Sequence, residues 1–188
     1  MDNDVSAGST SSTLGHLALG LTLLAFGIGS TGVIDNVGAA DASALATWVG
    51  GVALFVCGLF AFRDGDGRAG TAFAGLGAFW FTWGTGAGAQ VSAEAAGLFL
   101  LLWALLALTL TAAASGSGLL GQGVYGLLFL ALLMLAVGSF ADMSALGKVG
   151  GWVAAVAGLG AWYGATASLA KWPSLTGRRA RGSAATAS

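Results

Sequence analysis

Few side chains in this sequence are able to do chemistry, and most of these are uncharged. The one histidine, His16, lies near the start of a long apolar run, and hydroxyl residues such as Thr22 and Thr71 lie inside such runs. An imidazole can relay a proton, and a hydroxyl can replace water around a small solute. These residue types suggest a polar route through an apolar setting. The alternative is an interfacial histidine, with hydroxyls that donate to carbonyls of their own helix.

Enzyme signatures are absent. The sequence contains no HExxH, GxSxG, P-loop or Cys/His ligand set, and its glycines form no dinucleotide fingerprint. A single cysteine, Cys57, excludes a disulfide framework and a cysteine-based zinc site. The net charge of −1 gives no electrostatic support for a nucleic-acid partner. We therefore expect no enzymatic activity, no metal and no cofactor.

The composition indicates the kind of fold that contains these side chains. Of 188 residues, 56% are hydrophobic and only 8% are charged, against about 25% charged in an ordinary soluble domain. The apolar runs are long and do not alternate, which predicts membrane-spanning helices rather than barrel strands. The sequence thus predicts an all-α bundle of six transmembrane helices: Leu14–Ile34, Ala44–Phe62, Gly70–Gln90, Ala95–Ala114, Leu119–Phe140 and Val149–Ala170.

The connections between these runs leave no room for a soluble domain. We expect a polar N-terminal tail over residues 1–13, a transmembrane domain over 14–170 and a basic, disordered tail over 171–188. The first helix is expected to begin near Ser12 or Thr13, since either side chain can cap it.

Positive charges predict the orientation. With six spans, both tails and two of the loops share one side of the membrane, and six of the seven Lys and Arg residues lie there. Positive residues favour the cytoplasmic side, so we expect a plasma-membrane protein with both termini in the cytoplasm. The six are Arg63, Arg68, Lys171, Arg178, Arg179 and Arg181, and Lys148 is alone on the other side.

Residues 50–83 resemble the second and third helices of the acetate uptake transporters, the succinate–acetate permease family. The similarity rests on Gly50-Gly51, Gly58-Leu59, a short charged turn, Thr71-Ala72-Phe73 and Gly77-x-Phe79-Trp80, with weaker matches in the other spans, Leu14-Gly15, Gly20, Leu102-Trp103, Gly138 and Gly151-Trp152. The resemblance implies a six-helix fold, a homohexamer, and a pore in each protomer for acetate and similar monocarboxylates, with protons. Some relatives have been linked to ammonium export.

The resemblance also implies site residues. The family pore narrows at three apolar side chains, which correspond here to Leu19, Leu76 and Leu128, and Thr22 matches a hydroxyl position that faces the pore. We add Thr71 and His16 to the expected substrate pathway. The sequence departs from the family where helix one begins: residues 10–16 read Thr-Ser-Ser-Thr-Leu-Gly-His instead of Asn-Pro-x-Pro-Leu-Gly-Leu. The first two constriction positions are aromatic in well-known members, and a family glutamate is replaced by Ala61.

The function expected from these observations is passage of acetate or a similar small monocarboxylate across the membrane, coupled to protons. No fixed charge lies inside the predicted spans, so a neutral acid crosses more easily than an anion. Two alternatives stay open. One is conductance of ammonia, ammonium or another small neutral solute; the other is a structural or regulatory membrane protein with a closed pore. The expected partners are the weak-acid solute, the lipid bilayer and further copies of the chain.

Overall fold

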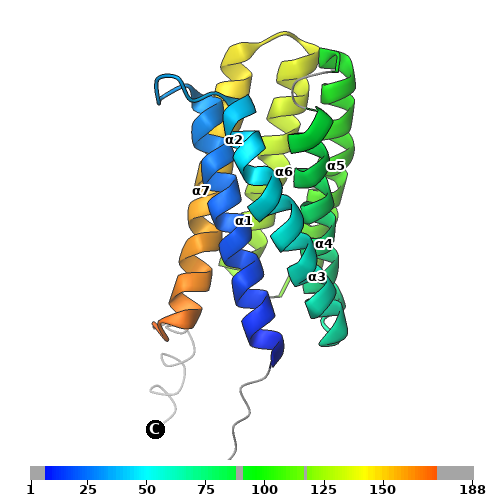
Figure 1. Cartoon of the computed structure of the whole chain (residues 1–188), viewed down its shortest axis with the longest axis vertical. Helices are drawn as coiled ribbons and strands as arrows, with labels where there is room; N and C mark the ends of the chain where they lie inside the picture. The colour runs from blue at the N-terminus through cyan, green and yellow to red at the C-terminus, as the bar shows by residue number, and fades with distance from the viewer. Residues whose placement is uncertain (1–6, 88–90, 117, 173–188) are drawn as a thin grey trace, which may run out of the picture.

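The computed structural model describes residues 7–87, 91–116 and 118–172, and all regular structure within these ranges is helical (Figure 1). Three consecutive elements join without a break, and so do two others, so the described residues form six rods, which confirms the predicted all-α fold. The elements are α1 (Ala7–Thr31), α2 (Ala39–Ala46), η1 (Thr47–Ala53), α3 (Leu54–Arg63), α4 (Gly67–Thr82), η2 (Trp83–Ala87), α5 (Ala93–Ala113), α6 (Leu119–Phe140) and α7 (Ser144–Leu169). The second rod is α2–η1–α3, and the third is α4–η2.

The six rods close into a ring. Helix α1 packs against α7, α7 against α6, α6 against α5, α5 against α4, α4 against α3, and α3 against α1. Successive rods run in opposite directions, as the short connections require (Figure 1). The first, third and fifth rods, which contain α1, α4 and α6, therefore run in the same direction and alternate with the other three around the ring.

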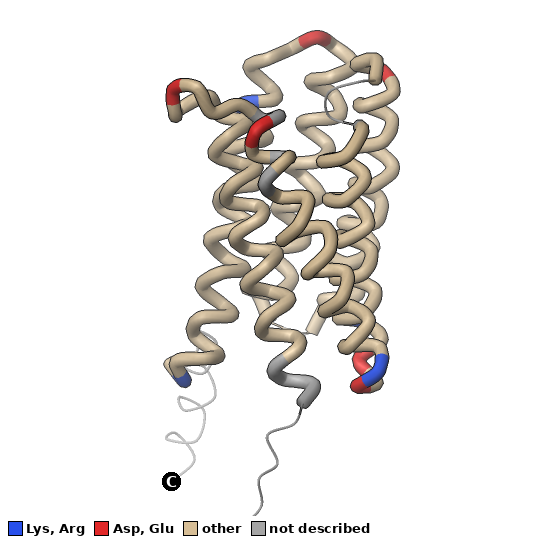
Figure 2. Tube along the Cα trace, viewed as in Figure 1, with Lys and Arg blue, Asp and Glu red and all other residues tan. Residues whose placement is uncertain are grey.

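The length and composition of the rods suit a bilayer. Four of them, α1, α5, α6 and α7, contain windows long and apolar enough to cross a membrane. At about 1.5 Å per residue, the second rod, α2–η1–α3, is also long enough to cross. The described charged residues lie at the two ends of the bundle, and the length between them carries none (Figure 2). This is the distribution expected of a transmembrane bundle.

Helix α1 begins earlier than the sequence predicted. It starts at Ala7, so Ser12 and Thr13 lie within the helix and do not cap it. The predicted tail of residues 1–13 is therefore partly helical. Part of the reason is that the run from Ala7 to Thr13 contains no proline, the residue that ends a helix most strongly, so the helix continues past the apolar run. The first six residues and residues 173–188, which include Arg178, Arg179 and Arg181, lie outside the described part of the chain.

Glycines permit close contact along the seam between α1 and α7. A Cβ added at Gly20 would lie 2.7 Å from the backbone nitrogen of Trp162, and one at Gly158 would lie 2.8 Å from the carbonyl oxygen of Gly20. The pattern repeats two turns further along, where a Cβ at Gly27 would lie 2.6 Å from the carbonyl oxygen of Gly151. Bare backbone on both helices is what brings the seam together, as in other membrane helix pairs.

Two short π-helical segments interrupt the second and third rods. Segment η1 contains Gly50 and Gly51, and its backbone approaches α1 at Thr22 and α4 at Phe81. A Cβ at Gly51 would lie 3.0 Å from the backbone of Phe81. Segments of this kind are rare and often lie at functional sites. The sequence predicts plain helix at both places.

The turn between α3 and α4 follows from its residues. Gly65 has a φ of +82°, a conformation that glycine adopts without strain. Asp66 then caps α4, since its side chain accepts a hydrogen bond of 2.9 Å from the backbone nitrogen of Ala69. The turn lies at the same end of the bundle as the start of α1 and the end of α7 (Figure 1).

Candidate functional site

The three leucines implied by the resemblance lie on alternate rods of the ring. Leu19 is on α1, Leu76 on α4 and Leu128 on α6, with exposed fractions of 0%, 1% and 1%. All three belong to one continuous cluster of buried apolar side chains. The three leucines therefore lie inside the bundle, on the three rods that run in the same direction.

A second layer lies one turn closer to the end that carries the chain termini. His16, Phe73 and Tyr125 each precede one of the leucines by three residues and therefore share its helix face. The His16 and Phe73 rings meet edge to face, with centroids 5.0 Å apart. Phe73 is fully buried and Tyr125 is 8% exposed. The mixed layer of imidazole, phenyl and phenol thus lies directly before the leucine layer.

A third layer, on the other side of the leucines, contains two buried polar atoms. Thr22 Oγ1 and Trp80 Nε1 are both shielded from solvent and have no hydrogen-bond partner among the described residues. Trp80 packs edge to face on Phe26, which lies one turn beyond Thr22 on α1. The Thr22 side chain also faces the bare backbone of Gly50 in the π-helical segment η1. A buried polar atom without a partner is costly, so this pair calls for an explanation.

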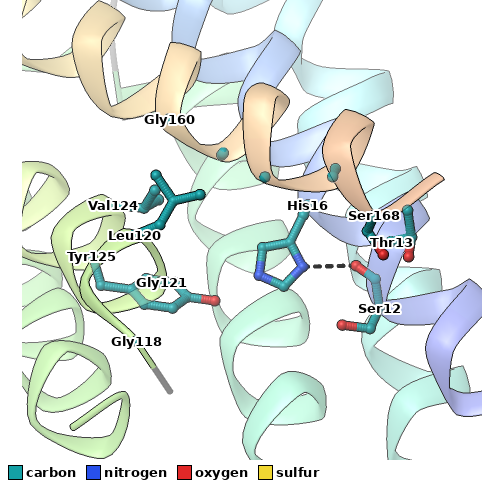
Figure 3. Close-up of a pocket in the computed structure, with 13 residues that line it drawn as sticks. Ser12, Thr13, His16, Gly118, Leu120, Gly121, Val124, Tyr125, Gly160 and Ser168 are labelled. Atoms are coloured by element: carbon teal, nitrogen blue, oxygen red, sulfur yellow. Dashed lines mark hydrogen bonds between the residues drawn. The ribbon is translucent and has the colours of Figure 1, made fainter. Parts of the chain in front are cut away.

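A cavity of about 330 Å³ opens beside His16 at the end of the bundle that carries the termini (Figure 3). Its walls come from α1, α6 and α7. Gly121, Gly160 and Gly164 leave much of the wall without side chains. A second hollow of about 210 Å³ shares Ser12, His16, Gly121 and Tyr125 with the first and extends toward the start of α4. The two hollows therefore form one vestibule around the imidazole.

One ring nitrogen of His16 is fixed by the backbone. Nδ1 lies 2.7 Å from the carbonyl oxygen of Ser12 (Figure 3). A carbonyl can only accept, so Nδ1 carries a proton, and Nε2 is the nitrogen that gains or loses one. The ring is held further by its edge-to-face contact with Phe73.

Two opposite charges lie beside the vestibule. Asp66 and Arg68, at the start of α4, line its second hollow. Asp66 is held by its capping bond, and Arg68 Nη1 donates to the carbonyl oxygen of Ala113 at 3.4 Å. Asp64 lies further out, where it accepts a hydrogen bond of 3.0 Å from the Ser11 hydroxyl.

The structure does not bring Thr71 to the other predicted pathway residues. Its side chain is exposed on an outer groove between α4 and α5, and its hydroxyl donates to the carbonyl oxygen of Gly67 at 2.7 Å. Thr109, Thr111 and Thr85 likewise donate to carbonyls of their own helices. Among the hydroxyls singled out, Thr22 is the one that is both buried and unpartnered in the described structure.

The aromatic residues in the middle of the third and fourth rods pack between helices. The rings of Phe79 and Phe99 stack with centroids 5.7 Å apart, and those of Trp83 and Phe99 lie 6.0 Å apart. Trp103 closes the group at 5.6 Å from Phe79. These rings fill the seam between α4 and α5, where the two backbones approach each other less closely than elsewhere in the ring.

Sequence reasoning missed Tyr125 and the indole nitrogen of Trp80. The signal for Tyr125 was available, because it precedes Leu128 by the same three residues that separate His16 from Leu19. No comparable signal marked Trp80, because it lies among three other aromatic residues and the sequence does not indicate which of the four rings turns inward. No group of three or more His, Cys, Asp and Glu side chains in the described ranges has the geometry of a metal site.

The chain is similar to one known protein family and to a solved structure. A sequence profile of the GPR1/FUN34/yaaH family matches residues 5–175. Among solved structures, that of the bacterial acetate channel SatP superposes with a TM-score of 0.77, covering 85% of this chain and 91% of the SatP chain at 24% identity. The two chains therefore share a fold. No curated protein sequence matches the chain.

Proposed function

The chain belongs to the GPR1/FUN34/yaaH family, and from this premise we propose that it carries acetate and similar small monocarboxylates across a lipid bilayer. The route is the centre of its own six-helix ring, and the protein moves its solute without catalysing a reaction. The shared fold with the acetate channel SatP supports this choice of solute.

The observation that carries the proposal is the pair of unpartnered donors inside the ring. Thr22 Oγ1 and Trp80 Nε1 are buried and have no hydrogen-bond partner among the described residues, and both follow the leucines of their own helices by about one turn. A carboxylic acid presents two oxygens that accept hydrogen bonds, so a passing molecule would satisfy donors of this kind. A purely structural core would gain stability by replacing these groups with apolar ones.

The mechanism has three parts. The vestibule around His16 admits the solute, the constriction of Leu19, Leu76 and Leu128 opens to pass it, and the donors beyond replace its water. The middle of the bundle carries no fixed charge (Figure 2). A bare anion is expensive there, whereas a neutral acid is not. We therefore propose that the solute crosses together with a proton.

We also propose the setting in which the protein works. It lies in the plasma membrane with both termini in the cytoplasm, as the excess of Lys and Arg on that side favours. It assembles as a homohexamer, and large apolar side chains on the outside of the ring, such as Leu102, Leu108 and Trp152, then face lipid or a neighbouring copy. Native mass spectrometry of the protein released from membranes measures the number of copies, with six expected.

Uptake of radiolabelled acetate into proteoliposomes at pH 5.5 and pH 7.5 tests the proposal. We expect uptake above that of empty liposomes at both values, and more at pH 5.5. Absence of uptake at both values would remove acetate as the solute. Competition by unlabelled propionate, lactate, succinate and ammonium then defines the solute class.

The same preparation separates the alternatives. If the protein conducts ammonia or another neutral solute, an ammonium pulse will change the internal pH while acetate does not move. If it is a structural or regulatory protein with a closed pore, neither solute will move, and substitutions at the constriction will leave both rates at the level of empty liposomes.

A further inference from the structure

We propose that the vestibule beside His16 is a carboxylate-binding site, in which His16 Nε2 and the Tyr125 hydroxyl hold the carboxyl group of a small acid before it reaches the leucine constriction. The inference rests on the proposed function and assigns the place at which the solute is held and exchanges its proton at the end of the bundle that carries the chain termini.

The imidazole is arranged for this task. Its Nδ1 is committed to the Ser12 carbonyl oxygen at 2.7 Å, and Nε2 has no hydrogen-bond partner among the described residues. Figure 3 shows the ring standing in the cavity, with Nε2 on the side of Tyr125. The contact with Phe73 fixes the ring plane. The one nitrogen able to change its protonation is thus turned toward the space that a solute would enter.

The Tyr125 hydroxyl faces the imidazole from the opposite wall. Its oxygen points across the cavity toward the His16 ring (Figure 3). The Tyr125 side chain is 8% exposed, so the phenol is held by packing and only its edge reaches the cavity. A carboxylate between the two residues would accept one hydrogen bond from the phenol and one from a protonated imidazole, which are charge-assisted bonds.

The size of the cavity suits a small acid. Its volume is about 330 Å³, and glycines at 121, 160 and 164 form part of the wall. A Cβ added at Gly164 would lie 3.0 Å from the Leu120 side chain, so side chains on these glycines would narrow the space. A two- or three-carbon acid fits with room for water.

The charges that face the vestibule make its net charge depend on His16. On α4, Asp66 and Arg68 carry opposite charges and offset each other. Asp64 is exposed at the outer edge beside Ser11, where solvent screens it. From α6 the one titratable group is Tyr125, and the residues that α7 contributes, such as Gly160, Ala161 and Ser168, carry no charge. A protonated imidazole therefore makes the site attractive to an anion, and a neutral imidazole does not.

The proton transfer follows from this arrangement. A protonated imidazole binds the carboxylate, the Nε2–H bond breaks, and an O–H bond forms on the acid. The electron pair stays on Nε2, leaving a neutral imidazole beside a neutral acid. The neutral acid then enters the apolar constriction, and the imidazole takes a new proton from water in the vestibule. No fixed positive charge remains to hold the solute back.

The presence of only one histidine in the chain allows a direct test. When the full-length protein is labelled with ¹⁵N-histidine and placed in lipid nanodiscs, the ring-nitrogen NMR signals come from His16 alone. We expect addition of acetate at pH 6.5 to shift the Nε2 resonance in a saturable way and to raise the midpoint of its pH titration. Acetamide, which has the same shape without the charge, should neither shift the Nε2 resonance nor change the midpoint of the titration.

Tyr125→Phe supplies the matched variant, because it removes one oxygen and keeps the ring. We expect it to weaken acetate binding at His16 by about tenfold, the loss of one charge-assisted hydrogen bond of ~1.4 kcal/mol. If the protein takes up acetate but saturating acetate does not change the His16 resonance, the vestibule site is overturned and the proposed function stays intact. Absence of both binding and uptake would contradict the proposed function itself.

A flux measurement gives a second readout. The ratio of acetate uptake by the wild type to that by His16→Gln cancels the solute's own titration, because both proteins see the same acid. We expect this ratio to rise severalfold as the pH on the vestibule side falls from 8 to 5.5. A ratio that is constant across this range would contradict proton transfer by His16.

Discussion

Thr22 and Trp80 are the residues on which the proposed route depends most. Each places a donor in the buried interior without a partner in the described structure, whereas Thr109 and Thr111 satisfy themselves within their helices. Sequence alone could not separate these threonines, because every one of them lies in an apolar run. The difference is one of packing: Thr22 turns toward the bare backbone of Gly50.

Thr22→Val and Trp80→Phe test whether these donors contact the solute. Each variant removes the hydrogen-bond donor. Valine keeps the branched shape of Thr22, and phenylalanine keeps an aromatic ring at position 80. We expect acetate uptake at low concentration to fall by about tenfold in each, since a hydrogen bond to a carboxyl group contributes ~1.4 kcal/mol. Thr22→Val should keep or raise thermal stability, because it removes an unsatisfied buried group at nearly constant volume. Trp80→Phe leaves a cavity at a buried site and should lower stability, so its uptake is measured per folded protein.

Thr109→Val is the matched control, because this hydroxyl is exposed and already bonded to the Leu105 carbonyl oxygen. It should leave uptake unchanged. Wild-type uptake per folded protein in both Thr22→Val and Trp80→Phe would mean that these donors do not contact the solute and that the solute takes another path.

At the scale of elements, glycine pairs decide which helices meet. Gly20 and Gly27 on α1 face Gly158 and Gly151 on α7, with spacings that return to the same helix face. Which glycines would meet could not be read from the sequence, because it depends on the register between two helices. The sequence did predict six rods, with most of their ends within about three residues. The π-helical segments were not predictable, because they arise from contacts between rods, such as Gly51 with Phe81.

Gly158→Ala tests the seam. The new Cβ would lie 2.7 Å from the backbone nitrogen of Leu24, and neither backbone can move away without separating the helices. We expect a loss of about 1–3 kcal/mol in stability, the range for overpacking a well-packed core, measured as a lower unfolding temperature in detergent.

Gly123→Ala is the control for this prediction. Nothing lies within 4 Å of a Cβ at this position on α6, and alanine favours helix over glycine. We expect equal or higher stability. If both alanine variants were equally stable, the close α1–α7 contact would not be what holds the seam together.

At the scale of the whole molecule, the six rods of the described structure form a ring whose interior is filled by buried apolar side chains. The layer of His16, Phe73 and Tyr125 leads to the layer of Leu19, Leu76 and Leu128, and no charged side chain lies beyond it until the far end of the bundle (Figure 2). The sequence led to the three leucines only through a family resemblance. Their placement on three alternate rods is a property of the closed ring, which no local pattern in the sequence contains.

The most direct test of a central route compares two leucines two residues apart on α6. Leu128 is 1% exposed and faces the ring centre, whereas Leu130 is 43% exposed on the outside. Leu128→Ala should widen the constriction and cost about 2–5 kcal/mol of stability, as burial of a leucine implies. Acetate uptake is therefore measured per folded protein, recovered by size exclusion.

We predict a severalfold higher rate of uptake for Leu128→Ala and the wild-type rate for Leu130→Ala. An unchanged rate in Leu128→Ala, or an equal rise in both variants, would contradict passage of the solute through the leucine constriction.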